Sequence, residues 1–215
     1  MKKPTYNEMM DLFEHAINNT LPEDFDQWDL TNRVGWSIAH EAAKHQTLPD
    51  DYSQIELKNI EGWSIGHIIA ESEIFDKDFD KWELKNRYGW SIAHSAAKCD
   101  TLPDGFDQWD LADRDGLSVG HVAAKYDNLP ENFDKWELAD NAGTTIAHTA
   151  AKYNNLPKGF IKWKICDHDG WSIAHSAAIH GHLPDDFNQW DLIDNYGNTV
   201  SDIIITYEEA FEAVE

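Results

Sequence analysis

The chain is poor in cationic residues and has no long apolar segment. Its 215 residues include 17 Lys and Arg against 40 Asp and Glu, which gives a formal net charge of −23. A charge of this sign and size repels nucleic acid and anionic membranes, so we expect neither as a direct partner. No apolar run approaches the roughly 18 residues that a membrane-spanning helix requires.

Cysteine is scarce as well, with only Cys99 and Cys166 in the sequence. They occupy different positions of the repeat described below and lie more than two repeat units apart, so we expect no disulfide bond between them. Low cysteine content is typical of a reducing compartment. The N-terminal residues lead into no apolar segment, so no secretory signal is predicted and a cytoplasmic location is expected.

A repeat of 27 residues organises most of the chain, and its register is marked by four residue types. Histidine recurs at His40, His67, His94, His121, His148 and His175. Glycine recurs at Gly35, Gly62, Gly89, Gly116, Gly143, Gly170 and Gly197. A Leu-Pro pair recurs with one exception, and tryptophan recurs at Trp28, Trp82, Trp109, Trp136, Trp163 and Trp190. Columns that stay in phase indicate six full copies of one structural unit and a partial seventh.

Each unit is predicted to contain a turn and two helices. Asn and Gly in residues 32–35 suit a tight turn, and Ser37 is a suitable N-cap for the helix that follows. Alanines spaced three and four apart form one stripe on that helix, where they allow close packing. A second, shorter helix is predicted from Pro22 to Trp28, with Pro at the first position and Phe25 on the same face as Trp28.

The two ends of the chain differ from the repeat. Thr5 and Glu8 form a capping-box pattern that predicts a helix through Ile17. Asp202 replaces the histidine of the last copy, and an acidic closing helix is predicted over residues 207–215. Because one unit is too short to bury its apolar stripe alone, we expect the units to stack. The predicted fold is therefore an all-α helical repeat solenoid with six full repeats and terminal caps.

We expect three segments along this solenoid. They are an N-terminal capping helix at 1–20, a repeat array at 21–197, and a partial repeat with a capping helix at 198–215.

The segment from Gly35 to Ala43 resembles the start of the ankyrin repeat, which has the pattern Gly-x-Thr-Pro-Leu-His-x-Ala-Ala. Ser37 matches the threonine and His40 the histidine, and this match recurs six times as far as Ala178. The units differ from ankyrin repeats in their period, which is 27 residues instead of 33, and in their shorter second helix. The resemblance implies helix-turn-helix units, a histidine that braces the turn through the preceding serine, and a protein-binding scaffold without catalysis.

Metal binding and catalysis are not expected. Equivalent positions on stacked helices lie about 8–10 Å apart, whereas metal ligands lie about 2.0–2.1 Å from one ion, so the recurring histidines are interpreted as structural. The Asp-x-Asp-Gly turns that begin at Asp113 and Asp167 have alanine where a calcium loop needs its distal glutamate. His180 and His182 form a lone pair in one loop and are kept as an alternative metal site. No cofactor, metal or catalytic residue is predicted, and the chain is not expected to be an enzyme.

Two tryptophan columns behave differently. The Trp28 column stays apolar in every unit, which is typical of a core position. The position after each glycine varies, and its occupants are Trp36, Trp63, Trp90, Leu117, Thr144, Trp171 and Asn198. These tryptophans are either exposed binding hot spots or side chains packed over a neighbouring turn. The predicted partner-binding residues are Trp36, Trp63, Trp90 and Trp171, with Arg33, Arg87 and Glu41 as a polar rim.

The predicted function is a scaffold that binds another protein through one face of the solenoid. The acidity favours a partner with a basic surface. The alternative is an acidic inhibitor that imitates nucleic acid and occupies a DNA- or RNA-binding protein. B-DNA carries one charge per about 1.7 Å, whereas the third and sixth units of this chain carry no net negative charge. The interruption of the acidic track therefore favours the scaffold.

Overall fold

The computed structural model describes residues 4–73, 75 and 79–204. Within these residues the structure is all-α, with isolated β-bridges and no β-strand. The helices are α1 (Tyr6–Ile17), α2 (Ile38–Lys44), α3 (Ile65–Ile69), α4 (Ile92–Cys99), α5 (Val119–Tyr126), α6 (Ile146–Lys152) and α7 (Ile173–Ala178). Residues 200–204 are helical too. This confirms the predicted all-α class.

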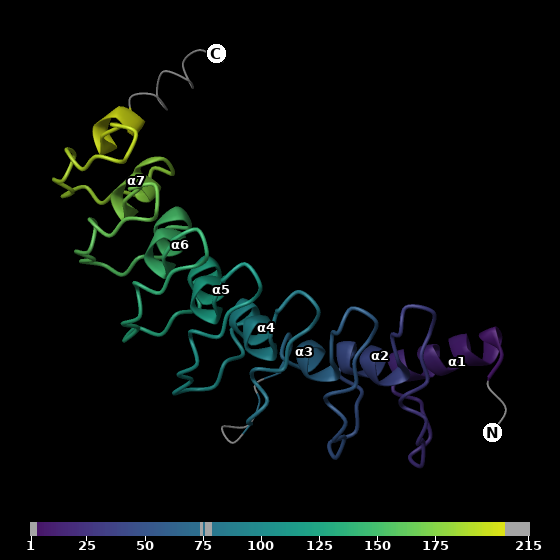
Figure 1. Cartoon of the computed structure of the whole chain (residues 1–215). Coiled ribbons are helices and arrows are strands. Elements are labelled where there is room, and N and C mark those ends of the chain that lie inside the picture. Colours follow the sequence, from purple (N-terminus) through teal and green to yellow (C-terminus); the bar gives the residue numbers. More distant parts are fainter. Residues whose placement is uncertain (1–3, 74, 76–78, 205–215) are drawn as a thin grey trace, which may run out of the picture. The chain divides into compact units, whose positions relative to one another are not determined.

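The chain divides into two compact units, Met1–Phe106 and Asp107–Glu215. The first unit contains α1 to α4 and the second contains α5 to α7. Within each unit, successive helices pack against one another in chain order, as a helical repeat requires (Figure 1). The division lies inside the array predicted for residues 21–197, and the segment limits drawn from the repeat remain predictions.

Helix α1 begins where the sequence predicts. The Glu8 backbone N–H donates to Thr5 Oγ1 over 3.3 Å, and the Thr5 N–H donates to Glu8 Oε2 over 2.6 Å. These reciprocal bonds make the capping box that the sequence indicates. Phe13 and Ala16 are buried on the side that packs against α2. The closing helix predicted over 207–215 lies outside the described residues.

Each repeat helix begins with a variant of the same capping box. The Ser37 hydroxyl accepts the backbone N–H of His40 over 3.2 Å, and the His40 ring accepts the Ser37 N–H over 3.2 Å. Histidine thus takes the place that Glu or Gln holds in the usual box. The predicted alanine stripe is buried, since Ala39 and Ala42 have no exposed surface.

The second helix predicted from Pro22 to Trp28 is wrong. The segment forms two consecutive turns, in which Phe25 N–H donates to the Pro22 carbonyl over 3.0 Å and Leu30 N–H donates to the Gln27 carbonyl over 3.2 Å. These bonds span three residues and are not continued by a helical series of i to i−4 bonds, so the segment closes as separate turns. Where the structure describes this segment, each repeat is therefore one helix flanked by turns, and the helix-turn-helix description of the unit is corrected.

Most of the Trp28 column belongs to the core, as its uniformity indicates: Trp82, Trp109 and Trp163 are buried, whereas Trp190 in the last copy is 41% exposed. In the second unit, tryptophan and phenylalanine rings alternate edge to face, with ring centroids 4.9–5.7 Å apart. These rings belong to Trp109, Phe133, Trp136, Phe160, Trp163, Phe187 and Trp190. Aromatic pairs of this geometry contribute about 0.5–1.5 kcal/mol beyond their buried area. The ladder therefore links successive turn segments of the second unit.

Candidate functional site

Within each unit, the recurring histidine joins one repeat to the next. The Nδ1 atom of His67 accepts the Ser64 backbone N–H over 3.2 Å, and its other nitrogen, Nε2, lies 3.0 Å from the Trp90 carbonyl. A backbone N–H can only donate and a carbonyl can only accept. The ring is therefore neutral, with its proton on Nε2, and both nitrogens are occupied by hydrogen bonds.

The same arrangement recurs along the chain. The distances from Nε2 to the carbonyl 23 residues ahead are 3.1 Å for His40, 2.9 Å for His121, 2.9 Å for His148 and 3.2 Å for His175. Burial lowers the pKa of these rings in three cases, His40, His121 and His148, and lowers the pKa of His67 to about 4. These four rings act as neutral braces, and their Nδ1 bonds to the hydroxyl of the N-cap residue are the role that the resemblance implied.

Other candidate ligands are also occupied by structural hydrogen bonds. His180 Nδ1 lies 2.9 Å from the Ser176 carbonyl and His182 Nδ1 lies 2.9 Å from the Ala151 carbonyl. Across the part of the chain that the structure describes, no three His, Cys, Asp or Glu side chains are grouped to hold a metal ion.

A turn with an Asn or Asp side chain at its base precedes each repeat helix. Asn32 Oδ1 accepts the N–H groups of Val34 and Trp36 over 3.0 and 3.1 Å. The equivalent residues make the same two bonds, and they are Asn59, Asn86, Asp113, Asp140, Asp167 and Asp194. The Asp-x-Asp-Gly sequences are thus Asx turns. The base is a neutral Asn throughout the first unit and a carboxylate throughout the second.

The two residues after each Asx base form the tip of the turn, and successive tips are bonded to one another. Ile60 N–H donates to the Val34 carbonyl over 3.4 Å, and Arg87 N–H donates to the Glu61 carbonyl over 3.0 Å. We call the first unit's tip residues the first tip row, which comprises Arg33, Val34, Ile60, Glu61, Arg87 and Tyr88. The second tip row comprises Arg114, Asp115, Asn141, Ala142, His168, Asp169, Asn195 and Tyr196. All of them are exposed except Glu61, which is half-buried.

The variable tryptophans are half-buried, and each packs against the histidine of its own repeat. The ring centroids lie 4.8 Å apart for Trp36 and His40, 5.4 Å for Trp63 and His67, 4.9 Å for Trp90 and His94, and 5.0 Å for Trp171 and His175. Three of the indole N–H groups donate to the side chain five residues ahead, at Glu41, Ser95 and Ser176. Trp63 has Ile68 at that position and lacks the bond. These indole rings therefore pack against the first turn of each repeat helix and remain partly exposed to solvent.

The hydrogen bond from the Trp36 indole N–H to Glu41 can be tested by substitution. Trp36→Phe removes an N–H that donates to the Glu41 carboxylate over 2.7 Å. Hydrogen bonds to charged groups contribute roughly 1.5–3 kcal/mol, so we expect the free energy of unfolding to fall by about 1.5 kcal/mol in urea titrations. Trp63→Phe is the matched control and should cost less than half as much. Equal losses in the two variants would contradict a role for this bond.

The three residues predicted to form a polar rim around the tryptophans do not all lie beside the indole rings. Glu41 lies under Trp36 and also contacts Lys44 at 3.8 Å and His45 at 3.2 Å. Arg33 and Arg87 instead stand at the turn tips. The exposed apolar tip residues were missed by sequence reasoning. In the sequence, these positions could be noticed only because they vary from repeat to repeat, next to an Asn or Asp and a glycine that recur in every repeat.

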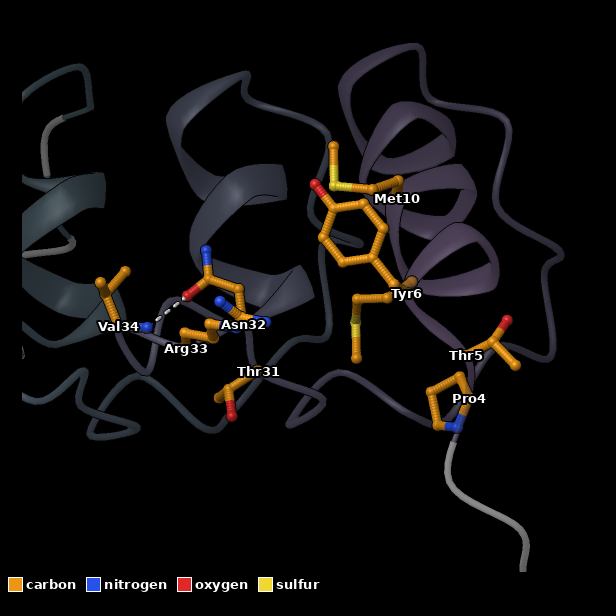
Figure 2. Close-up of a pocket in the computed structure, with 9 residues that line it drawn as sticks. Pro4, Thr5, Tyr6, Met10, Thr31, Asn32, Arg33 and Val34 are labelled. Carbon is orange, nitrogen blue, oxygen red and sulfur yellow. Dashed lines mark hydrogen bonds between the residues drawn. The ribbon is translucent and has the colours of Figure 1, made fainter.

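A pocket of about 800 Å³ opens beside the first tip. It lies between α1 and the Asx turn and is lined by Pro4, Thr5, Tyr6, Met9, Met10, Thr31, Asn32, Arg33 and Val34 (Figure 2). Tyr6 is 75%, Met10 49% and Val34 54% exposed. An open apolar surface of this kind, bordered by an arginine, is typical of a contact site for another molecule.

Comparison with known proteins adds no family assignment. No protein-family model matches the sequence, and no significant similarity to a curated protein is found. Among the described helices, none combines the length and apolar character needed to cross a membrane.

Proposed function

We propose that this chain is a cytoplasmic protein-binding scaffold, an ankyrin-like solenoid of six repeats that binds its partner through its tip rows and performs no catalysis. The observation that supports this most is the contrast within each repeat. The Asx base, the glycine, the Ser or Thr cap and the histidine recur almost unchanged, whereas the exposed tip residues differ from repeat to repeat. Variable side chains on an ordered support are typical of recognition surfaces.

The tips are held in place by hydrogen bonds, which favours binding. Each Asx base fixes its turn with two hydrogen bonds, and the bonds between tips, such as that from Arg87 N–H to the Glu61 carbonyl, fix neighbouring turns. A surface that is already ordered loses less conformational entropy when it binds. The tips can therefore contribute more of their contact energy to affinity than a flexible loop of the same composition.

The acidity of the chain still favours a partner with a basic surface for part of its contacts. In the second unit, Asp115 and Asp169 are exposed at the tips. Charges of this kind accelerate encounter with a basic protein. The arginines at other tips interrupt any continuous acidic track, so the scaffold is favoured over a nucleic-acid mimic.

The test combines identification of the partner with variants of the tips. Affinity capture by the full chain, followed by mass spectrometry, identifies binding proteins, which are then purified. The triple variant Val34→Ser, Ile60→Ser and Tyr88→Ser should weaken binding at least tenfold, because these exposed side chains contribute the contact area. Far-UV circular dichroism should be unchanged.

The control for this experiment uses exposed aromatic residues away from the tips. Tyr126→Ser with Tyr153→Ser changes side chains that are 42% and 39% exposed at the ends of α5 and α6. We expect this variant to bind as the wild type does. Loss of binding in the control with no loss in the triple variant would place the interface elsewhere and reject the proposal.

A further inference from the structure

Arginine is confined to one position of the repeat. The chain has three arginines, Arg33, Arg87 and Arg114, and each is the first residue of a tip. All other cationic residues are lysines, and none occupies this position. The planar guanidinium donates two parallel hydrogen bonds to a carboxylate, which the lysine ammonium cannot do. Tips that carry arginine are therefore suited to bind carboxylates.

The arginines of the first unit are little compensated by nearby acids. Asn32 and Asn86, the bases of their turns, are uncharged, and within the described residues no carboxylate lies within ion-pair distance of Arg33. Arg87 lies 4.0 Å from Glu61 in an exposed pair, and such pairs contribute little. Arg114 differs because it lies between Asp113 and Asp115. The first tip row therefore has positive groups available to a ligand, although the chain as a whole is acidic.

Apolar side chains lie between and beside these two arginines. Ile60 occupies the tip between them and is 65% exposed, and Tyr88 adjoins Arg87 and is 46% exposed. On the other side, Arg33 and Val34 line the pocket that Tyr6 and Met10 form (Figure 2). Because the Ile60 N–H donates to the Val34 carbonyl, the pocket and the tips form one continuous surface.

We propose that the first tip row and the adjoining pocket bind an extended peptide segment of a partner protein that carries two acidic residues with apolar residues between and beside them. One carboxylate pairs with Arg33 and the second with Arg87. An apolar side chain contacts Ile60, and another enters the pocket beside Tyr6. This inference rests on the proposed function and specifies the chemistry of the partner.

The repeat spacing sets the separation of the two acidic residues. Equivalent positions in neighbouring repeats lie about 8–10 Å apart, so Arg33 and Arg87 are separated by about 16–20 Å. An extended chain advances about 3.3 Å per residue. The two acidic residues of the ligand should therefore be five or six positions apart. A polyanion such as nucleic acid is disfavoured, because the net charge of −23 repels it as a whole.

The experiment is a selection from a random twelve-residue phage-displayed peptide library on the immobilised full chain. We expect enrichment of peptides with two Asp or Glu residues five or six positions apart and an apolar residue between them. The most enriched peptide is then synthesised, and its affinity for purified variants is measured by fluorescence anisotropy. Arg33→Gln and Arg87→Gln should each weaken binding about tenfold. Arg114→Gln, at the equivalent position of the second unit, should bind as the wild type does.

Glu61→Gln separates recognition from structural support. Glu61 competes with the ligand carboxylate for Arg87, so its neutralisation should tighten peptide binding by about threefold. If Arg87 only stabilised the fold through Glu61, this variant would weaken binding or leave it unchanged. Circular dichroism and thermal unfolding of all variants should match the wild type, because these side chains are at the surface.

Several outcomes would overturn the inference. They are enrichment of basic peptides, enrichment of acidic peptides that bind the arginine variants equally well, failure to enrich any sequence, equal binding of a single-stranded oligonucleotide, and self-association of the chain through the tips in sedimentation. The proposed function can survive each of them. Suppose that a captured partner no longer binds the Val34, Ile60 and Tyr88 variant but binds both arginine variants as tightly as the wild type. The proposed scaffold function would then be supported, and only the proposed chemistry of the ligand would be wrong.

Discussion

Gly62→Ala is expected to lower the free energy of unfolding by about 2–5 kcal/mol. Gly62 has a φ of +82°, and a Cβ atom there would lie 2.9 Å from the Arg87 backbone nitrogen and 3.0 Å from the Asn86 Cα. The left-handed backbone costs a non-glycine residue roughly 1–2 kcal/mol. Forcing an extra methyl group into packed surroundings typically adds about 1–3 kcal/mol. The neighbouring tip must move, which also strains the bond from Arg87 to Glu61.

Gly105→Ala is the matched control for this substitution. Gly105 has a φ of +80°, but a Cβ atom there would meet no other atom within 4 Å. This variant retains the backbone cost and lacks the clash, so its loss should remain near 1–2 kcal/mol. Urea unfolding monitored by circular dichroism measures both values. Equal losses at the two positions would show that the tips do not depend on close packing at glycine.

Acid is expected to destabilise the fold well before the carboxylates titrate. The unfolded-state pKa of histidine is about 6.5, whereas burial lowers the pKa of His67 to about 4 in the folded state. The unfolded chain therefore binds more protons between these values, so stability is fully present above pH 6.5 and is lost as pH falls towards 4. The shift of His67 alone corresponds to about 3 kcal/mol at pH 4. His40, His121 and His148 act in the same direction.

Urea unfolding between pH 7.5 and pH 4 measures this effect. The wild type should lose stability steeply below pH 6.5, and His67→Gln should show a shallower dependence because one titrating group is gone. At pH 7 the variant is also less stable by about 1–3 kcal/mol, since the Trp90 carbonyl loses its donor. A flat profile from pH 7 to pH 5, or an unchanged slope in the variant, would show that the histidines are not buried neutral braces.

Features with a local cause could be predicted from the sequence. The capping box of Thr5 and Glu8 and the serine cap at Ser37 depend on residues three positions apart, so α1 and the start of α2 were predicted correctly. The segment after Pro22 was predicted incorrectly, as a helix instead of turns. The Pro22 carbonyl accepts the Phe25 N–H, and a bond between residues three apart occurs both in an isolated turn and in the first turn of a helix, so the pattern could not distinguish the two.

The candidate site was harder to predict because its residues acquire their meaning from the neighbouring repeat. Whether Trp36 faces solvent depends on where the His40 ring lies, and that ring is positioned by the carbonyl of Trp63 in the next repeat. The apolar tip residue Ile60 is conspicuous only once the bonds between turns are known. The arginines, by contrast, could be noticed from the sequence, because their charge and their shared position in the repeat were both visible.

The histidine brace gives the repeat a direction. The rings of His40, His67, His121, His148 and His175 each donate to a carbonyl 23 residues further along, so each of these repeats needs another repeat after it; His175 uses the carbonyl of Asn198 in the partial seventh copy. At the equivalent place in that copy, Asp202 accepts the N–H and the hydroxyl of Thr199 over 2.8 and 2.7 Å. A carboxylate is only an acceptor, so it caps the helix without requiring a carbonyl from a further repeat. Asp202 therefore caps the helix of the seventh copy without needing a bond to another repeat. Inserting or removing one whole unit of 27 residues ahead of it is therefore expected to leave the described braces with an acceptor.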